Sequence, residues 1–340
     1  MTVPDLSRPS YAIISPVRDE ARHVRRTLEA IVAQTHLPSE WVIVDDGSTD
    51  ATREIVSEYV AEYPWIRLIE SRRQGRRARG GRIVEAFNRG RVELRRRPDL
   101  TVKLDGDLYL PPNYFAWVAE VFARVPTAGV VGGIGQIWDG AAWVPEKAGH
   151  HNVVGYCKAY RTACLDDIGG LHSSMGWDGI DEYGARARGW SVHVLSELSV
   201  LHFKQRGSAQ KWWRARWEEG VGNAFMGYRL DFLMLRAGYR GLVETPAVLS
   251  GLVLLSGFLW ARIIGKPQVP DIEARAVLRK EQRSRIRALL RASRASSLTP
   301  PLTGNGPAFW MDGSLGSTAR QHQVPQGRLA LSVPGADDAH

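Results

Sequence analysis

The sequence has few cysteines, and its N-terminal stretch lacks the pattern expected of a targeting segment; each observation argues against a class of protein. Its two cysteines, Cys157 and Cys164, are too few among 340 residues for a disulfide framework and lack the paired spacing of a zinc site. The N-terminal stretch "MTVPDLSRPS" is polar and contains two prolines, unlike a secretory signal or an amphipathic transit peptide. We therefore expect a cytoplasmic protein with reduced thiols.

A long apolar run is also missing. The most hydrophobic segment, "PAVLSGLVLLSGFLWARIIG" at 246–265, has only fifteen uncharged residues from Ala247 to Ala261, whereas a spanning helix needs about 20. A buried core helix, a short or tilted span and an in-plane anchor remain open. An in-plane anchor suits the basic flanks, which are Arg236, Arg240, Arg262 and Lys266. We expect this segment to contact the inner face of the cell membrane.

Positive charge is in excess. The chain has 45 Lys and Arg against 36 Asp and Glu, a net charge of +9, which favours anionic partners such as nucleic acid, nucleotide phosphates or an acidic membrane. Arginines concentrate in "RRQGRRARGGR" at 72–82 and "RVELRRR" at 91–97. Across 72–97 the only aromatic residue is Phe87, so base-stacking side chains are not interleaved with the charges. Nucleic acid is not an expected partner, although a nucleic-acid-binding protein remains an alternative.

From residue 11 the chain alternates short β-branched runs with helical patterns, which is typical of a parallel α/β sheet. Strands are predicted at 11–15, 41–48, 65–70, 100–107, 128–138 and 191–203, and helices at 20–34, 49–63, 80–94 and 114–125. From about 292 the chain is rich in Ser, Pro and Gly, and a disordered tail is expected over 292–340.

Acidic residues close two of the predicted strands. Asp45 and Asp46 follow the second strand, and Asp105 and Asp107 follow the fourth. Because ligands bind at the carboxyl ends of strands in open α/β sheets, we expect the four carboxylates on one rim. Their repulsion calls for a cation, and Mg²⁺ or Mn²⁺ completes its coordination with water and substrate phosphates.

Each acidic pair then has a distinct task. The Asp-x-Asp pair would hold the metal on a diphosphate, and the acid after the second strand would accept hydrogen bonds from a base or ribose. Taken alone, Asp105-Gly106-Asp107 is typical of a β-turn. Its combination with the other acids and the alternating strands favours the metal site.

At this point the residues match a known family. "YAIISPVRDEARHVRRTLEAIVAQTHLPSEWVIVDDGSTDAT" resembles the opening of family 2 glycosyltransferases, and the resemblance continues through "AFNRG", "VKLDGDLYLPPNYF", "YRTACLDDIGGL" and "GWDGIDEYGARARGW". It covers roughly residues 10–220. The resemblance implies the GT-A fold, a Rossmann-like nucleotide-sugar-binding α/β domain, with a helical C-terminal extension. The expected division is a tail at 1–10, the GT-A domain at 11–220, a helical, membrane-associated extension at 221–291 and the tail at 292–340.

The resemblance also assigns the donor site. It implies nucleotide contacts from Pro16, Arg18 and Glu20 after the first strand, a base contact from Asp45 with Asp46 beside it, and donor contacts from the arginines that include Arg79. It implies that Asp107 coordinates the metal and that Asp105 contacts the ribose or the metal. His202 after the last strand is a third candidate metal ligand, against a purely structural role for a lone histidine. Lys204 and Arg206 are candidates to neutralise the leaving diphosphate.

The catalytic base is less defined. An inverting transfer needs a carboxylate that takes the proton of the acceptor hydroxyl, and the family supplies it from a Glu-Asp pair before a helix, about eleven residues ahead of a glycine. Counting back from Gly189 gives Asp178, whereas local similarity favours Asp181, with Glu182 next. Helix capping alone is the structural alternative for these acids.

The resemblance implies a metal-dependent, inverting glycosyltransferase that uses a nucleotide-diphosphate sugar and a glycan or lipid-linked acceptor. "VGNAFMGYRLDFLMLRAGYRGLVE" resembles a bacterial subgroup of exopolysaccharide and envelope glycan synthesis. In "WWRARW" Trp213 replaces the glutamine of the motif of processive members, which argues against processivity. A nucleotidyltransferase is the nearest alternative, but "SPVRDE" lacks the glycines of its phosphate loop. An inactive nucleotide-binding relative is the third.

Overall fold

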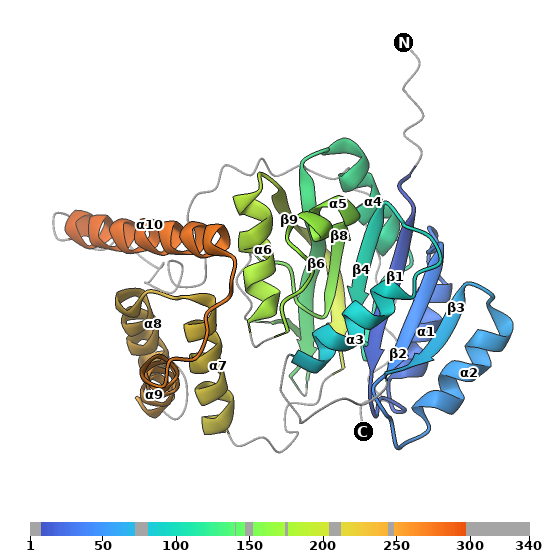
Figure 1. Ribbon diagram of the computed structural model, residues 1–340, viewed down its shortest axis with the longest axis horizontal. Coiled ribbons are helices and arrows are strands. Elements are labelled where there is room, and N and C mark those ends of the chain that lie inside the picture. The colour runs from blue at the N-terminus through green and yellow to red at the C-terminus, as the bar shows by residue number, and fades with distance from the viewer. Residues whose placement is uncertain are drawn as a thin grey trace, which may run out of the picture.

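The computed structural model describes residues 8–71, 81–139, 141–146, 152–173, 176–203, 212–243 and 248–296. One nine-stranded sheet runs through the described chain in the order β3-β2-β1-β4-β8-β6-β9-β5, with β7 paired to β6. Figure 1 shows this sheet beside a group of C-terminal helices. Helix α10 (Ile272–Ser296) continues past residue 292, and the rest of the expected tail, 297–340, lies outside the described residues.

The first half of the sheet is parallel, as the alternating pattern predicts. It consists of β1 (Tyr11–Val17), β2 (Glu40–Asp45), β3 (Ile66–Glu70) and β4 (Leu100–Leu104). Helices α1 (Val24–Val32), α2 (Thr52–Glu62) and α3 (Gly81–Val92) connect these strands. Strands β2 and β4 are buried throughout because helices cover both faces of the sheet, which explains their unbroken apolar runs.

The second half of the sheet differs from the predicted parallel arrangement. Strand β8 (Cys157–Arg161) runs antiparallel to both of its neighbours, β4 and β6 (Ala128–Trp138). Strand β9 (Ser191–His202) is parallel to β6, and β5 (Leu108–Tyr109) is antiparallel to β9. Strand β7 (Trp143–Pro145) extends one edge of β6. The sheet is therefore mixed.

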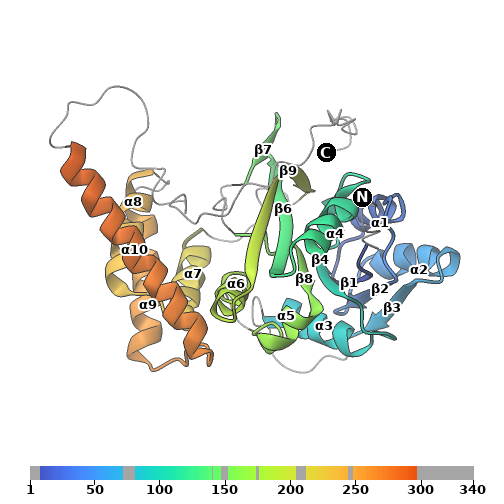
Figure 2. The ribbon, with the colours of Figure 1, turned by 90° about the horizontal axis from the view of Figure 1, so that it is seen from above.

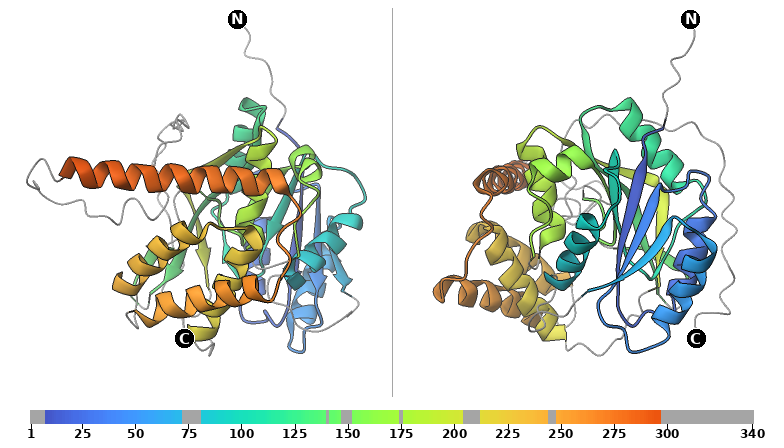
Figure 3. Two further views of the ribbon diagram at one scale, coloured as in Figure 1. Left: turned by 60° about the vertical axis from the view of Figure 1, so that its left-hand side comes forward. Right: turned by 45° about the vertical axis from the view of Figure 1, so that its right-hand side comes forward.

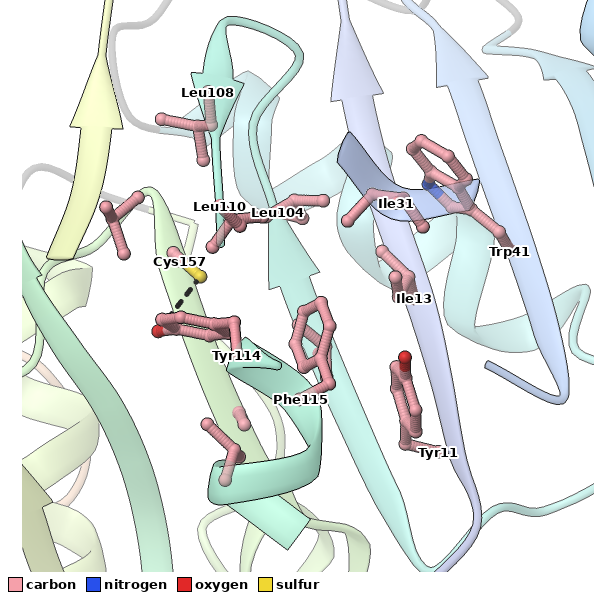
Figure 4. Packing of buried hydrophobic residues seen from close by; sticks show 14 of the residues in the cluster. Tyr11, Ile13, Ile31, Trp41, Leu104, Leu108, Leu110, Tyr114, Phe115 and Cys157 are labelled. Atoms are coloured by element: carbon pink, nitrogen blue, oxygen red, sulfur yellow. Dashed lines mark hydrogen bonds between the residues drawn. The ribbon is translucent and has the colours of Figure 1, made fainter. Parts of the chain in front are cut away.

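The helices form two layers, one on each face of the sheet (Figure 2). Helices α1, α2 and α4 (Tyr114–Arg124) bury their apolar sides against one face. Helices α3, α5 (Thr162–Asp167) and α6 (Trp177–Ala187) cover the other face. In the first layer the rings of Tyr11 and Phe115 stack 4.8 Å apart, and Cys157 donates to the Tyr114 hydroxyl (Figure 4).

Both cysteines lie in the core. Cys157 and Cys164 are buried and free of disulfides, and burial raises the pKa of each thiol to about 12. Neither thiol is therefore a reactive thiolate at neutral pH.

The predicted helical C-terminal region is confirmed. Helices α7 (Trp212–Met226), α8 (Leu230–Val243) and α9 (Leu249–Ile263) form a closely packed group, and α10 lies across it and against α6 (Figure 3). Ile180 and Tyr183 of α6 share an apolar cluster with Met226 and Leu278. None of the described helices is long and apolar enough to cross a membrane.

Candidate active site

The turn Asp105-Gly106-Asp107 lies between β4 and β5, beside the end of β1. A Cβ on Gly106 would come 2.9 Å from Cγ1 of Val17, so the close approach of the turn to β1 requires a glycine. Val17 also pairs with Asp45 across β1 and β2. The two acidic clusters therefore flank the end of β1, and the predicted common rim exists.

A buried hydroxyl of α1 holds this turn in place. Thr27 Oγ1 lies 2.9 Å from the Gly106 carbonyl and 2.8 Å from the Leu108 carbonyl, and it accepts the Leu108 N–H at 2.9 Å. The sequence pattern gives no signal for this contact, because Thr27 is 81 residues from Leu108.

We predict that Thr27→Val lowers the free energy of unfolding by about 1–3 kcal/mol, because the Leu108 N–H loses its buried acceptor. Urea denaturation of both proteins measures the difference. Thr35→Val is the matched control: the same change at an exposed position of the α1–β2 connection should stay within about 0.5 kcal/mol of wild type. Equal stability of the Thr27 and Thr35 variants would contradict the assigned role of Thr27.

Asp107 and His202 are in contact. The Leu108 and His202 positions are opposite each other in the β5–β9 register, which brings the His202 Nε2 to 3.1 Å from the Asp107 Oδ2. The Nδ1 of His202 is buried and has no hydrogen-bond partner in the described structure. Two of the three predicted metal ligands therefore meet.

Asp105 is engaged differently. Its carboxylate lies 2.5 Å from the ammonium of Lys103, a residue of β4 that is only 1% exposed. Lys103 also donates to the Gly155 carbonyl at 2.9 Å and lies over the Trp177 ring. Burial raises the pKa of Asp105, whereas Lys103 lowers it. The structure thus separates the two aspartates: Lys103 neutralises Asp105, and Asp107 faces His202.

No group of three or more His, Cys, Asp and Glu side chains that could hold a metal ion is found in the described residues. The Asp107–His202 pair nevertheless fits a cation that takes few protein ligands. Mg²⁺ and Mn²⁺ accept oxygen and imidazole donors and fill their remaining positions with water and phosphate oxygens. Such a cation would therefore depend on a bound diphosphate.

The two acids after β2 also differ from each other. Asp45 is fully buried, and its carboxylate accepts the N–H groups of Gly47 and Ser48 and pairs with Arg53 Nε at 2.6 Å. Asp46 is part-exposed and lies 3.9 Å from Arg18. The carboxylate of Asp45 thus already accepts from its own loop and from Arg53 of α2, whereas Asp46 lies near two arginines, Arg18 and Arg82 (3.7 Å).

The loop after β1 is tied to the loop after β2. Asp19 has a positive φ of 53° and accepts the Thr49 N–H at 2.7 Å, and the Glu20 N–H donates to the Thr52 hydroxyl. The pKa of Asp19 is lowered, and the largest cause is this hydrogen bond from the Thr49 N–H. Pro16 is in register with Val44 of β2. The predicted nucleotide-contacting residues Pro16, Arg18 and Glu20 therefore belong to the same rim.

The three candidate bases have unequal surroundings in α6. Asp181 accepts the Tyr160 hydroxyl at 2.5 Å and pairs with Lys158 at 3.0 Å, and Glu182 pairs with Lys158 at 2.9 Å. Both acids are nearly inaccessible, at 3% and 0% exposure. Burial raises the pKa of Glu182 to about 7, with Lys158 opposing it. These two acids are thus held inside the fold.

Asp178 is the exposed member of the set. It lies in the first turn of α6, and its side chain packs on Gly155, where a Cβ would come 2.8 Å from the Asp178 Cβ. Asp178 is exposed as a residue, but its carboxyl group packs on Gly155, so desolvation raises its pKa, and the positive charge of Lys158 lowers it. Its backbone carbonyl accepts Lys158 Nζ, so the buried lysine fixes the turn that presents this carboxylate.

Three predicted site residues, Arg79, Lys204 and Arg206, lie outside the described residues. Lys103 and Lys158 are site residues that sequence reasoning does not identify. Each stands in a short apolar strand run, "TVKL" or "CKAY". Because a lysine is almost never fully buried unless it is paired, its place in such a run is the one available signal.

Comparison with known proteins finds relatives of part of the chain. Residues 12–147 match the profile of glycosyl transferase family 2. An uncharacterised glycosyltransferase of Nostoc sp. is 34% identical over 112 residues, 33% of this chain and 32% of that protein. The succinoglycan biosynthesis protein ExoA of Rhizobium meliloti is 30% identical over 121 residues, 35% of this chain and 34% of that protein. The chain thus spans about a third of the length of these curated relatives.

Similarity of structure extends further along the chain. TarS residues 1–349 of S. aureus, solved in complex with UDP-GlcNAc, superpose with a TM-score of 0.52 at 18% identity, covering 85% of this chain and 88% of that one. The chain therefore has the GT-A fold with a helical C-terminal region, and its residues 12–147 match glycosyl transferase family 2.

Proposed function

We propose that this chain is an inverting, metal-dependent glycosyltransferase that moves a sugar from a nucleotide-diphosphate donor to an acceptor hydroxyl. The observation that carries the proposal is the link between Asp178 and the Asp105–Asp107 turn. The side chain of Asp178, an exposed residue, packs on Gly155, and the ammonium of Lys103 donates to both the Gly155 carbonyl and the Asp105 carboxylate. A group able to take a proton is thereby fixed beside the carboxylates that would face the diphosphate.

Asp178 acts as the base in this proposal. Its carboxylate accepts the proton of the acceptor hydroxyl as the oxygen attacks the anomeric carbon and the bond to the diphosphate breaks. Asp181 and Glu182 bind Lys158 instead, and Lys158 holds the turn that carries Asp178. The base, undecided in the sequence between Asp178 and Asp181, is assigned to Asp178 because it is the one exposed residue of the three.

Asp107 and His202 would hold the divalent cation, Mg²⁺ or Mn²⁺. When bound, the cation stabilises the negative charge that develops on the departing diphosphate. Asp105 stays with Lys103, and this neutralised pair lets a diphosphate approach the rim without repulsion from a second carboxylate.

The nucleotide would occupy the ends of β1 and β2. Asp46 is the acid that accepts hydrogen bonds from the base or ribose, because the oxygens of Asp45 already accept from Gly47, Ser48 and Arg53. Arg18, near Asp46, would contact the phosphates. In this proposal Asp46 takes the contact with the nucleotide base that the sequence assigned to Asp45.

The acceptor is proposed to be a glycan or lipid-linked glycan of the cell envelope or an exopolysaccharide. The similarity to ExoA, whose name assigns it to succinoglycan biosynthesis, supports this class. Such acceptors are presented at the inner face of the cytoplasmic membrane, where we place the enzyme.

A thermal-shift panel of nucleotide sugars tests the donor site. We expect one donor to raise the Tm by at least about 4 °C at a hundredfold excess over its Kd, with Mn²⁺ present and not with EDTA. ATP and CTP with Mn²⁺ are the controls for nucleotidyl transfer. A shift with these nucleotides and none with any nucleotide sugar would favour a nucleotidyltransferase instead.

A further inference from the structure

One face of helix α9 is apolar and uncovered. The exposed side chains of this helix recur at helical spacing, and Ser256 is the single polar member before Arg262. The large ones are Leu249 (51% exposed), Leu252 (53%), Leu259 (43%), Trp260 (39%) and Ile263 (83%). A contiguous patch of exposed apolar side chains on a protein surface marks a site of contact with another protein or with a membrane.

Glycine contacts on the opposite side of α9 fix which face points outward. A Cβ on Gly257 would lie 2.3 Å from the carbonyl oxygen of Trp217 in α7, and one on Gly251 would lie 2.4 Å from that of Ala237 in α8. Any larger residue would push the helices apart. The helix is therefore held in one rotation about its axis, with the five apolar side chains on the outer side.

Tryptophans border this face. Trp213, Trp217 and Trp260 line a groove of about 370 Å³ between α7 and α9, and the rings of Trp217 and Trp260 are 5.5 Å apart. Trp213 is 46% exposed. Lys266 lies over the Trp260 ring, 4.6 Å from its centroid. Tryptophan and lysine together are typical of a membrane–water interface, where the ring has an apolar body and a polar edge.

Cations gather at the C-terminal end of α9. Arg236 and Arg240 bind Glu219, whereas Arg262 and Lys266 are exposed. Burial lowers the pKa of Arg279 in α10, and the positive charges of Arg275 and Arg262 lower it further. These positive charges interact with one another across α9 and α10, so this end of the helix attracts anions.

We infer that the outer face of α9 lies in the plane of an anionic lipid bilayer, with Leu252, Leu259 and Ile263 among the acyl chains and Arg262 and Lys266 on lipid phosphates. Charge decides between a bilayer and a second copy of the chain. A self-contact would bring together two molecules that each carry a net charge of +9. An acidic headgroup layer neutralises them while the apolar face is buried.

The inference identifies the surface by which the chain would reach the membrane location given in the proposed function. It rests on that function only for the nature of the acceptor. It also specifies the orientation of α9, since the side of the helix that faces α7 and α8 is occupied. The lipid-facing side is the one on which Leu249 and Ile263 are exposed.

Vesicle co-sedimentation of the full chain tests the surface. We expect binding to vesicles of phosphatidylcholine with phosphatidylglycerol, weaker binding to phosphatidylcholine alone, and release by high salt. Leu252→Ser with Ile263→Ser should weaken the apparent affinity by at least about tenfold, and Arg262→Gln should weaken it in the anionic vesicles only. Val92→Ser is the matched control, because Val92 is an 80% exposed aliphatic residue on α3.

The inference would be overturned if wild type did not bind the anionic vesicles, or if wild type and the Leu252/Ile263 variant bound them equally. A wild-type dimer that this variant converts to a monomer would assign the face to a second copy instead. The donor thermal shift, measured on the same variants without lipid, should be unchanged. Its absence in wild type would count against the transferase function and leave the lipid result standing.

Discussion

Asp178→Asn is expected to lower kcat by about 10²–10⁴-fold, because an amide cannot take the proton of the acceptor hydroxyl. Asn has nearly the same shape as Asp, and the side chain is exposed at the first turn of α6, so the Tm should stay close to that of wild type. The KM for the donor should change little, since the donor contacts lie on the turn and the rim. Initial rates with the donor identified by thermal shift measure both constants.

Asp181→Asn separates the two candidate bases. Asp181 accepts the Tyr160 hydroxyl and pairs with buried Lys158, so its loss should lower the free energy of unfolding by about 3 kcal/mol. At a temperature where the variant is folded, its kcat should fall far less than that of Asp178→Asn. The reverse order of kcat losses would make Asp181 the base and would refute the assignment to Asp178.

The pH profile gives a second check on Asp178. Desolvation raises its pKa above the ordinary value of an aspartate, and the base acts only when it is deprotonated. The acidic limb of the kcat/KM profile should therefore fall at a higher pH than an unperturbed aspartate would give. That limb should disappear from the residual activity of Asp178→Asn.

The parallel half of the sheet could be predicted because its inner strands, β1, β2 and β4, are buried on both faces. The runs "YAIIS" and "WVIVD" are continuously apolar, and the acids that follow them mark the rim. The direction of β8 could not be predicted, since "CKAYR" has the same period in either direction. Its antiparallel pairing with β4 and β6 is set by long-range contacts.

The acidic residues of the site could be predicted from the sequence, but the side chains that they contact could not. The sequence treats Asp105 and Asp107 as a pair, but Lys103 binds the first and His202 contacts the second. The family resemblance also assigns the contact with the nucleotide base to Asp45, whose carboxylate oxygens accept hydrogen bonds from Gly47, Ser48 and Arg53. These contacting residues belong to different secondary-structure elements, so the spacing of residues along the chain does not predict the contacts.

The base shows the same limit. Asp178 and Asp181 are three residues apart on one helix, and a count of residues from Gly189 cannot tell which carboxylate is exposed. Their surroundings differ because Lys158 and Tyr160, on β8, meet the side of α6 that carries Asp181. The packing of α6 on an antiparallel strand is therefore what supports the proposed assignment to Asp178, and that strand was absent from the sequence prediction.

Asp107→Asn should reduce kcat/KM at least about 10³-fold and remove the Mn²⁺ dependence of donor binding, because a neutral amide is a poor ligand for a hard divalent cation. The fold should persist, since Asp107 is part-exposed in the turn between β4 and β5 and its contact with His202 can be kept by an amide oxygen. Donor titrations with and without Mn²⁺, followed by thermal shift, measure the effect alongside initial rates.

Asp46→Asn is the matched control for Asp107→Asn, since it makes the same substitution on the same rim at a residue near Arg18. It should weaken donor binding while the remaining binding still requires Mn²⁺. The two variants therefore separate recognition of the nucleotide from neutralisation of the diphosphate. If Asp107→Asn keeps wild-type turnover and Mn²⁺ response, the cation does not bind at the Asp107–His202 pair. The acids of the rim would then act only through their hydrogen bonds and through Lys103.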